Sequence, residues 1–256
     1  MFTHTHTHTP LLSVQWVCGE TGVVQPLARL AAIAHRSGAS LHVDAAQAVG
    51  RLPIDLAAFP GIDFLTFSGH KLHGPLGTGV LYAREPRSLT PLLLGGEQER
   101  GVRSGTENLP GIVGLALACE LRRRGLPEAI ARMRHLRDRF EARVIGEVVG
   151  AAVNGAGAPR VGNTSNLRFL GLDGQALLAQ LDRRGIACSQ GSACSSRRPQ
   201  PSHVLRAMGL SEDEAFSSLR FSFSVLNTNE DVERAACAIK DATAQLRALP
   251  SLLEAL

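Results

Sequence analysis

Apolar positions along the chain follow two periods in alternation, and this alternation predicts the fold. Apolar runs of strand length occur at residues 11–17 (LLSVQWV), 61–69 (GIDFLTFSG) and 77–84 (GTGVLYAR). Residues 25–38 (QPLARLAAIAHRSG) have helical spacing with Gly38 as a stop signal, and residues 39–50 (ASLHVDAAQAVG) read as a strand that turns into a short helix. Strands that alternate with helices predict an α/β fold with a mostly parallel sheet covered by helices.

The pattern changes after residue 108, where longer helical patterns begin. Residues 107–125 and 127–148 have helical spacing interrupted near Gly125 and Pro127. From residue 163 onward the order strand, helix, strand, loop, helices, strand, helix predicts a smaller α+β unit. We therefore expect three parts: a low-complexity tail at 1–10, a large domain at 11–125, and a connecting helix with a small C-terminal domain at 126–256.

Composition and charge narrow the class of protein. With 256 residues, 44% of them apolar and 20% charged, the chain can bury one large core or two smaller ones. The net charge of +4 comes from scattered arginines, and the cluster Arg122–Arg124 is typical of a solvated helix face, so we predict no nucleic-acid partner. No apolar run approaches the roughly 18 residues of a membrane span, which predicts no membrane partner and a cytoplasmic location.

The cysteines and the first histidines give little evidence of a metal site or a disulfide framework. The five cysteines form an odd, widely spread set without CxxC spacing: Cys18, Cys119, Cys188, Cys194 and Cys237. One of them could instead carry chemistry. Near the N-terminus, His4, His6 and His8 alternate with threonines and could hold a transition metal weakly, but a disordered tail is the favoured interpretation.

Candidate chemistry lies where two predicted strands end. Asp44 ends one strand, and the cluster Ser68 to Lys71 ends the next, so both are expected at the rim of the sheet where ligands bind. A neutral lysine amine can form a Schiff base with an aldehyde, and Ser68 and His70 offer donors suited to a phosphate. The alternative is an exposed loop lysine beside a capping serine.

Asp44 and Gln47 extend this reading to a cofactor. Asp44 could keep the ring nitrogen of pyridoxal phosphate protonated, and Gln47 could donate to the ring's phenolic oxygen, although an aspartate at a strand end is usually a helix cap. Together, HVDAAQ and SGHK resemble the cofactor site of the class V aminotransferase family. Further blocks resemble those of cysteine desulfurases, in the same order, from about residue 12 to residue 245: ETGVVQPL, GGEQERGVRSGTEN, NTSNLRF, SQGSACSSRRPQPSHVLRAMGL and SSLRFSFSVLNTNEDV.

The resemblance implies a fold, an activity and a homodimer. The fold would be a large pyridoxal-phosphate domain with a small C-terminal domain, and the activity would take sulfur from L-cysteine and leave alanine. By motif, the cofactor residues would be Lys71 as the Schiff-base lysine, Asp44 and Gln47 at the ring, and Ser68 and His70 at the phosphate. Thr106, in RSGT, resembles the threonine that reaches the phosphate of the neighbouring subunit.

The resemblance also assigns the sulfur chemistry and the substrate contacts. Cys194 would carry the sulfur as a persulfide and pass it to an iron–sulfur scaffold or another acceptor protein, and it could contact iron–sulfur clusters during transfer. Its competitor Cys188 is expected in a strand, as a small buried core residue. Arg220 matches the arginine that binds the substrate carboxylate, and Asn163 is expected to help there.

Two departures from the family pattern leave alternatives open. Members have an earlier segment with a Gly-Thr phosphate turn and a histidine stacked on the cofactor ring, and Cys18 and Gly19 stand where the family has two asparagines. We therefore expect a desulfurase without its N-terminal part, with weak cofactor retention and exposed apolar surface on the large domain. The function is either cysteine desulfurase, with selenocysteine lyase as a variant, or that of an impaired or inactive relative acting as a binding or dimerising module.

Overall fold

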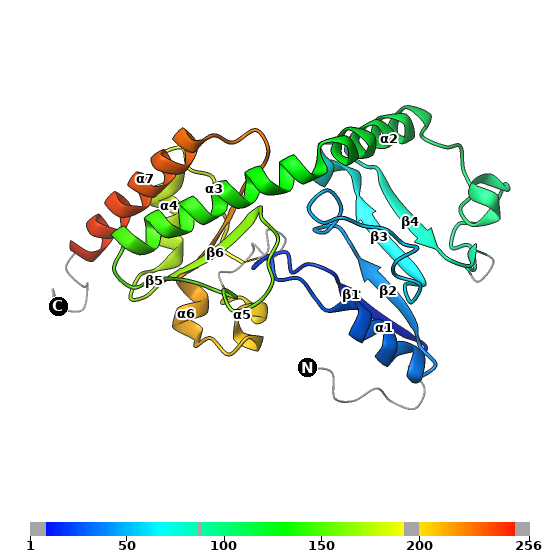
Figure 1. Cartoon of the computed structure of the whole chain (residues 1–256), viewed down its shortest axis with the longest axis horizontal. Helices are drawn as coiled ribbons and strands as arrows, with labels where there is room; N and C mark the ends of the chain where they lie inside the picture. The colour runs from blue at the N-terminus through cyan, green and yellow to red at the C-terminus, as the bar shows by residue number, and fades with distance from the viewer. Residues whose placement is uncertain (1–8, 87–88, 192–199, 249–256) are drawn as a thin grey trace. The chain divides into compact units, whose positions relative to one another are not determined.

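The computed structural model describes residues 9–86, 89–191 and 200–248, and the chain divides into two compact units (Figure 1). The chain passes from one unit to the other at three points. The first unit is formed by Met1–Val17 with Gln25–Leu126, and the second by Cys18–Val24 with Pro127–Leu256. The short segment Cys18–Val24 thus groups with the second unit, although the sequence pattern places it within residues 11–125.

The first unit is built on a four-stranded sheet. Its strands, in spatial order, are β1 (Leu11–Gln15), β2 (Ser40–Asp44), β3 (Phe64–Ser68) and β4 (Gly79–Ala83). β1, β2 and β3 are parallel, and β4 is antiparallel to β3. A mostly parallel sheet of an α/β fold is therefore confirmed.

In the described part of the first unit, helices and short 3-10 turns accompany the sheet. They are α1 (Leu27–Arg36), η1 (Gly69–Leu72), η3 (Gln98–Gly101) and α2 (Leu109–Arg124). α1 buries Leu27 and Ala34 and packs against β2, and it ends before Gly38, whose φ of +69° is accessible at low cost to glycine. Asn108 caps α2 by accepting a hydrogen bond from the backbone N–H of Gly111 at 3.1 Å.

The alternation of buried and open positions in β2 separates the two faces of the sheet. Leu41 and Val43 are fully buried, while His42 and Asp44 point to the other face and are only half-buried. On that second face the His42 ring bonds Ser13 Oγ at 2.7 Å and Thr66 Oγ1 at 3.0 Å. A polar stripe therefore crosses three strands on the face that carries Asp44.

The second unit is a smaller α+β assembly. Its antiparallel sheet has the order β5 (Ala151–Val153), β6 (Thr164–Phe169) and β7 (Ser218–Ser222). Its helices are α3 (Leu126–Glu147), α4 (Gly174–Asp182), α5 (His203–Ala207), α6 (Glu212–Phe216) and α7 (Asn229–Ala248). The short strand β5 is absent from the sequence prediction, since three residues give too little pattern to identify.

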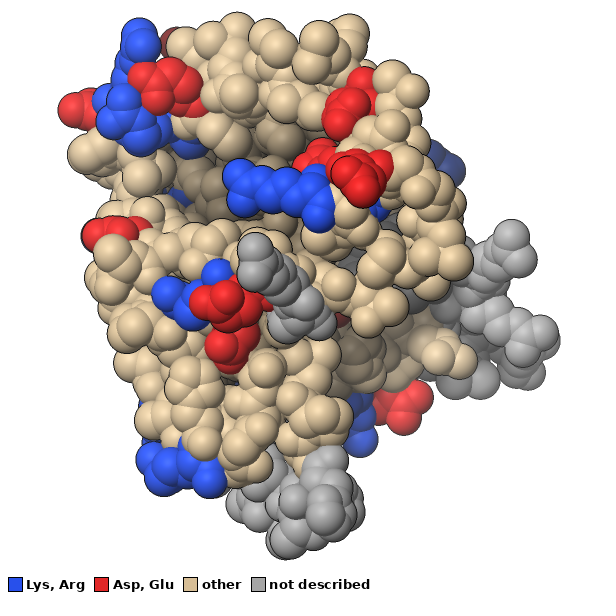
Figure 2. Space-filling model, turned by 90° about the vertical axis from the view of Figure 1, so that its right-hand side faces the viewer, with Lys and Arg blue, Asp and Glu red and all other residues tan. Residues whose placement is uncertain are grey.

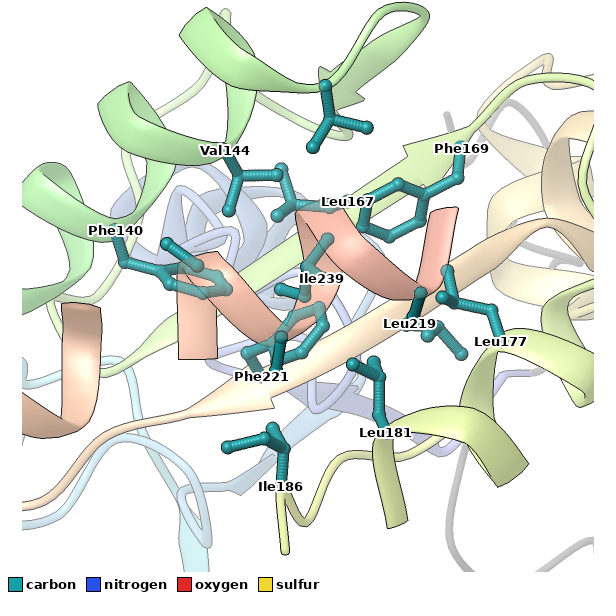
Figure 3. Close-up of a cluster of buried hydrophobic side chains, with 14 of the residues drawn as sticks. Phe140, Val144, Leu167, Phe169, Leu177, Leu181, Ile186, Leu219, Phe221 and Ile239 are labelled. Carbon is teal, nitrogen blue, oxygen red and sulfur yellow. The ribbon is translucent and has the colours of Figure 1, made fainter. Parts of the chain in front are cut away.

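The core of the second unit lies between this sheet and its long helices (Figure 3). Phe140 from α3 contacts Phe221 from β7 with ring centroids 4.9 Å apart, and Leu167 and Ile239 are fully buried beside them. Truncating a fully buried aromatic side chain such as Phe140 to alanine typically costs about 3–5 kcal/mol. This core holds β6 and β7 in place, and with them the residues that flank Arg220.

Two local predictions are wrong. The residues after β2 form successive turns instead of a helix, because Ala48 N–H bonds Ala45 C=O at 2.9 Å and Gly50 takes a φ of +75° that ends the turn. Cys188 does not lie in a strand: only Ser189 pairs with β7, in an isolated bridge to Arg220. The extended backbone does not continue beyond this bridge, since Gly191 has a φ of +65°, outside the range of a strand.

The surface carries charges of both signs in small groups. Figure 2 shows lysine and arginine side chains interspersed with aspartate and glutamate over one face, with broad uncharged areas between them. A row of apolar residues spaced four positions apart lies on α2, and each of them is more than half exposed: Leu109, Val113, Leu117 and Leu121. We call these four residues the α2 stripe. Within the part of the chain that the structure describes, no helix is both long and apolar enough to cross a membrane.

Candidate active site

The candidate site of the first unit lies at the carboxyl ends of two neighbouring parallel strands. Asp44, the last residue of β2, is paired in register with Thr66 of β3, two residues before Ser68. Asp44 and the Ser68–Lys71 segment therefore lie at the same edge of the sheet, as the strand pattern predicts.

Asp44 holds the turn that follows its strand. Its Oδ1 accepts a hydrogen bond from the N–H of Ala46 at 2.9 Å. Its other oxygen, Oδ2, has no hydrogen bond to any residue that the structure describes. Gln47 lies half-buried in the same turn, and its amide likewise has no partner among the described residues. Asp44 is therefore a cap of a turn with one carboxylate oxygen left for a further donor.

The chain turns sharply at Gly69, which places three polar side chains at the end of β3. Gly69 is buried, its N–H bonds Thr78 C=O at 2.9 Å, and an added Cβ would lie 2.5 Å from Thr78 Oγ1. Only glycine fits this close approach. Ser68, His70 and Lys71 follow one another around the turn.

These three side chains are available to a ligand. Ser68 occupies the N-cap position of η1 but makes no capping hydrogen bond, and Lys71 is half-buried rather than exposed. Neither the hydroxyl of Ser68, the ring of exposed His70 nor the ammonium of Lys71 pairs with another described residue. The interpretation of an exposed lysine beside a capping serine therefore does not describe this segment.

Arg51, which no sequence motif marks, connects the turn after β2 with the turn after β3. Its guanidinium donates from Nη1 to Ala46 C=O at 3.2 Å and from Nη2 to Lys71 C=O at 3.4 Å. Burial, followed by the charge of Arg122, lowers the pKa of Arg51 to about 10. It remains a cation at neutral pH. Nothing in its sequence context distinguishes Arg51 from other scattered arginines.

Thr106 lies in an exposed loop between η3 and α2. Glu99 and Arg100, in η3 just before this loop, have φ values of +51° and +60°, a conformation that costs non-glycine residues free energy. Gln98 accepts a hydrogen bond from Gly105 N–H through Oε1 at 3.1 Å, which holds the loop next to Thr106. The hydroxyl of Thr106 has no partner within the described residues.

Arg220 and Asn163 belong to the second unit. Arg220 lies in β7 and donates from Nη1 to Gly19 C=O at 3.0 Å and from Nη2 to Ser189 Oγ at 3.3 Å, while its buried Nε has no partner among the described residues. Asn163 is buried just before β6, where its C=O accepts from Phe223 N–H at 2.8 Å and its Oδ1 accepts from Thr164 Oγ1 at 3.3 Å.

The segment Cys18–Val24 is held tightly on the second unit. Val24 N–H bonds Pro159 C=O at 2.8 Å, and Val161 N–H bonds Gly22 C=O at 2.9 Å. Gly22 has a φ of +75°, and an added Cβ would lie 3.0 Å from Thr164 Cβ. This segment therefore holds the Gly19 carbonyl that accepts a hydrogen bond from Arg220. The sequence gives no signal for this contact, because glycine acts here through its backbone and not through a side chain.

The two candidate cysteines, Cys188 and Cys194, differ in what the structure describes. Cys188 is half-buried against the core of the second unit, and burial, followed by the charge of Asp182, raises the pKa of its thiol to about 12. Such a thiol is protonated at neutral pH and is a poor nucleophile. Cys194 lies outside the described residues, as do His4, His6 and His8.

Comparisons with known proteins agree on one family. A sequence model of the aminotransferase class-V family matches residues 1–235. A cysteine desulfurase of Gluconacetobacter diazotrophicus is 46% identical over 239 residues, which are 93% of this chain and 60% of the relative. The chain spans about 60% of the length of the curated relatives it matches.

Solved structures give the same result. A NifS-like protein from Rickettsia africae has a TM-score of 0.84 at 33% identity, over 94% of this chain and 64% of that one. A structure of SspA in complex with cysteine has a TM-score of 0.69 at 34% identity, over 88% of this chain and 61% of that one.

Proposed function

Because the chain belongs to the aminotransferase class-V family, we propose that it acts as a pyridoxal-phosphate-dependent cysteine desulfurase. The reaction would take the sulfur of L-cysteine and leave L-alanine. The observation that carries the proposal is the cluster of polar groups at the ends of β2 and β3, among which the Lys71 ammonium has no partner within the described residues. The similarity to named cysteine desulfurases and to a protein solved with cysteine supports the same choice of substrate.

The residues at the sheet edge fit pyridoxal phosphate. Ser68 Oγ and the His70 ring offer donors for a phosphate, and Gly69 brings the backbone close. The free oxygen of Asp44 suits a protonated ring nitrogen, and Gln47 suits a phenolic oxygen. When bound, the cofactor supplies an electron sink for the electron pair released from the substrate. Lys71 would hold its aldehyde carbon covalently.

Arg220 would bind the substrate carboxylate, since its planar guanidinium matches a two-oxygen anion. Gly19 and Ser189 already orient it, and Asn163 would add a side-chain amide at the same group. Cys194 would act as the nucleophile: its thiolate bonds to the substrate sulfur as the carbon–sulfur bond breaks, which leaves a persulfide on Cys194.

The acceptor and the subunit arrangement follow from the same assignment. We propose that the persulfide sulfur passes to an iron–sulfur scaffold or another acceptor protein. Two copies of the chain would form a homodimer in which Thr106 of one copy reaches the phosphate bound by the other. Two observations support this contact with a second copy: the Thr106 hydroxyl has no partner among the described residues, and Glu99 and Arg100 of the preceding η3 hold costly positive φ values.

The chain offers a clean test of Lys71, because Lys71 and Lys240 are its two lysines. Purified protein is incubated with pyridoxal phosphate, reduced with borohydride and mapped by peptide mass spectrometry. The amine of Lys71 condenses with the aldehyde, water leaves, and hydride from borohydride fixes the link as a secondary amine. We expect the label on Lys71, its loss in Lys71→Ala and its retention in Lys240→Ala.

The sulfur step has its own control, measured with an added thiol that reduces the Cys194 persulfide to sulfide and is itself oxidised to a disulfide. Cys194→Ser should abolish sulfide release from L-cysteine while leaving the Lys71 label intact, and Cys188→Ser should change release little. A label confined to Lys240 or the N-terminal amine would contradict the cofactor assignment. Equal loss of sulfide release in both cysteine variants would contradict the choice of Cys194.

A further inference from the structure

The Arg220 guanidinium is held by groups from two places in the second unit. Nη2 donates to Ser189 Oγ, on the residue whose backbone N–H and C=O also pair with Arg220 at 3.0 and 2.7 Å. Nη1 donates to Gly19 C=O, on a segment distant in sequence. The direction of the guanidinium therefore depends on where the peptide after Gly19 is held.

That peptide is fixed through Glu20. The C=O of Glu20 accepts a hydrogen bond from Asn166 Nδ2 at 3.1 Å, and its carboxylate Oε2 accepts one from Ser202 Oγ at 2.5 Å. Glu20 is only 4% exposed, and Ser202 is also buried. The backbone and side chain of Glu20 are thus both anchored, one residue from the carbonyl that Arg220 contacts.

A role in filling space does not account for a carboxylate at this position. A buried carboxylate loses its hydration, and a single hydroxyl donor replaces only part of it, so an apolar side chain of similar size would be cheaper. Ser202 has a second task, since its Oγ also accepts from Leu205 N–H at 3.2 Å and caps α5. The carboxylate of Glu20 is therefore fixed by a side chain that α5 itself immobilises.

We propose that Glu20 is a positioning residue for Arg220. Its bond to Ser202 fixes the peptide of Gly19, and the Gly19 carbonyl in turn orients the guanidinium. The consequence for catalysis rests on the proposed function, in which Arg220 binds the carboxylate of L-cysteine. Glu20 itself touches neither substrate nor cofactor in this scheme.

The first experiment follows Arg220 directly and needs no activity. Protein labelled with ¹⁵N-arginine gives Nε–H signals by NMR, and the signal lost in Arg220→Lys identifies Arg220. Because this Nε is buried, its hydrogen should exchange slowly with water. In Glu20→Ala we expect exchange to speed up by about tenfold or more, since the local structure opens more often.

Three further variants separate positioning from general damage. Ser202→Ala should also speed up exchange of the Arg220 Nε hydrogen. This variant keeps the test decisive if Glu20→Ala does not fold. Glu20→Gln should restore slow exchange, because its amide oxygen still accepts from Ser202. Glu230→Ala, on an exposed glutamate at the start of α7, should change nothing. An unchanged exchange rate of the Arg220 Nε hydrogen in folded Glu20→Ala or Ser202→Ala would overturn the proposal.

The second experiment measures sulfide release with added pyridoxal phosphate. We expect Glu20→Ala to raise the KM for L-cysteine by about tenfold with kcat changed less than about threefold, because binding is weakened more than the later chemistry. A fall in kcat at constant KM would contradict the proposal. Absence of sulfide release from the unaltered chain would contradict the proposed function, and the Arg220 exchange measurement would still decide the role of Glu20.

Discussion

Arg51 and Lys71 are joined by a hydrogen bond of 3.4 Å from the guanidinium Nη2 to the lysine carbonyl oxygen. The same guanidinium bonds the carbonyl of Ala46, between Asp44 and Gln47. One cation thus connects the two backbone turns that carry the proposed cofactor residues. Because these two hydrogen bonds of Arg51 go to main-chain oxygens, they leave the Lys71 ammonium unengaged.

Replacing Arg51 should loosen this edge of the sheet. In Arg51→Met two backbone carbonyls lose a charged donor, and we expect the free energy of unfolding to fall by about 1–3 kcal/mol. Pyridoxal phosphate should also be lost faster on dialysis. Urea unfolding and cofactor absorbance measure the two effects. Arg29→Met, at an exposed position of α1, is the matched control, and equal effects in both variants would contradict the role of Arg51.

Gly22 and Gly38 form a matched pair for testing how the Cys18–Val24 segment is held. Both have positive φ values, +75° at Gly22 and +69° at Gly38. An added Cβ at Gly22 would lie 3.0 Å from Thr164 Cβ, whereas an added Cβ at Gly38 would have no neighbouring atom within 4 Å. Gly38→Ala should cost about 1–2 kcal/mol for the backbone conformation alone. Gly22→Ala should cost more, because overpacking adds about 1–3 kcal/mol. Urea unfolding of both variants would show equal losses if the contact with Thr164 were unimportant.

The raised pKa of Cys188 predicts a loss of stability at alkaline pH. Its thiol has a pKa of about 12 when folded and an ordinary value of 9.0 when unfolded. Between these values the unfolded chain binds fewer protons than the folded one, so stability falls as pH rises, by up to about 1.4 kcal/mol per pH unit. Unfolding measured from pH 8 to 11 should show a shallower decline in Cys188→Ala.

The control for this pH dependence is Cys237→Ala, at an exposed thiol. That variant should follow the unaltered protein across the whole range. Identical slopes for the protein and Cys188→Ala would mean that the Cys188 thiol is not desolvated in solution.

The α2 stripe predicts self-association. Exposed apolar rows of this kind favour contact with another apolar surface. Sedimentation velocity should show less association in Val113→Ser with Leu117→Ser than in the unaltered chain. Leu226→Ser, at an exposed leucine of the second unit outside the α2 stripe, should leave association unchanged. Association that persists in the double variant would exclude the α2 stripe as the contact.

The sequence predicts the sheet edge well because its signals are local. Apolar runs end at Asp44 and Ser68, and parallel strands bring such ends together without any further information. It also predicts the long helices, where periodicity extends over many residues. The residues after Asp44 are predicted as a helix because AAQAV has good helix propensity, whereas the Asp44 cap and Gly50 select turns.

The contacts around Arg220 were not predictable in this way. Gly19 acts through a backbone carbonyl, and Glu20 meets Ser202 across 182 positions of sequence. Neither kind of contact leaves a periodic pattern or a characteristic spacing. Arg51 escapes notice for a related reason, since its partners are two main-chain oxygens that any residue could supply.

The assignment of Cys18–Val24 to the second unit has a consequence for dissecting the protein. A polypeptide that starts at Pro127 would lack the seven residues Cys18–Val24 of the second unit. It would therefore lose Val23, the bridge partner of Arg160, and the Gly19 carbonyl oxygen that Arg220 contacts. No single cut of the chain yields either unit whole. Autonomous folding of the C-terminal part would therefore require grafting this heptapeptide back, or supplying it as a separate peptide whose binding could itself be titrated.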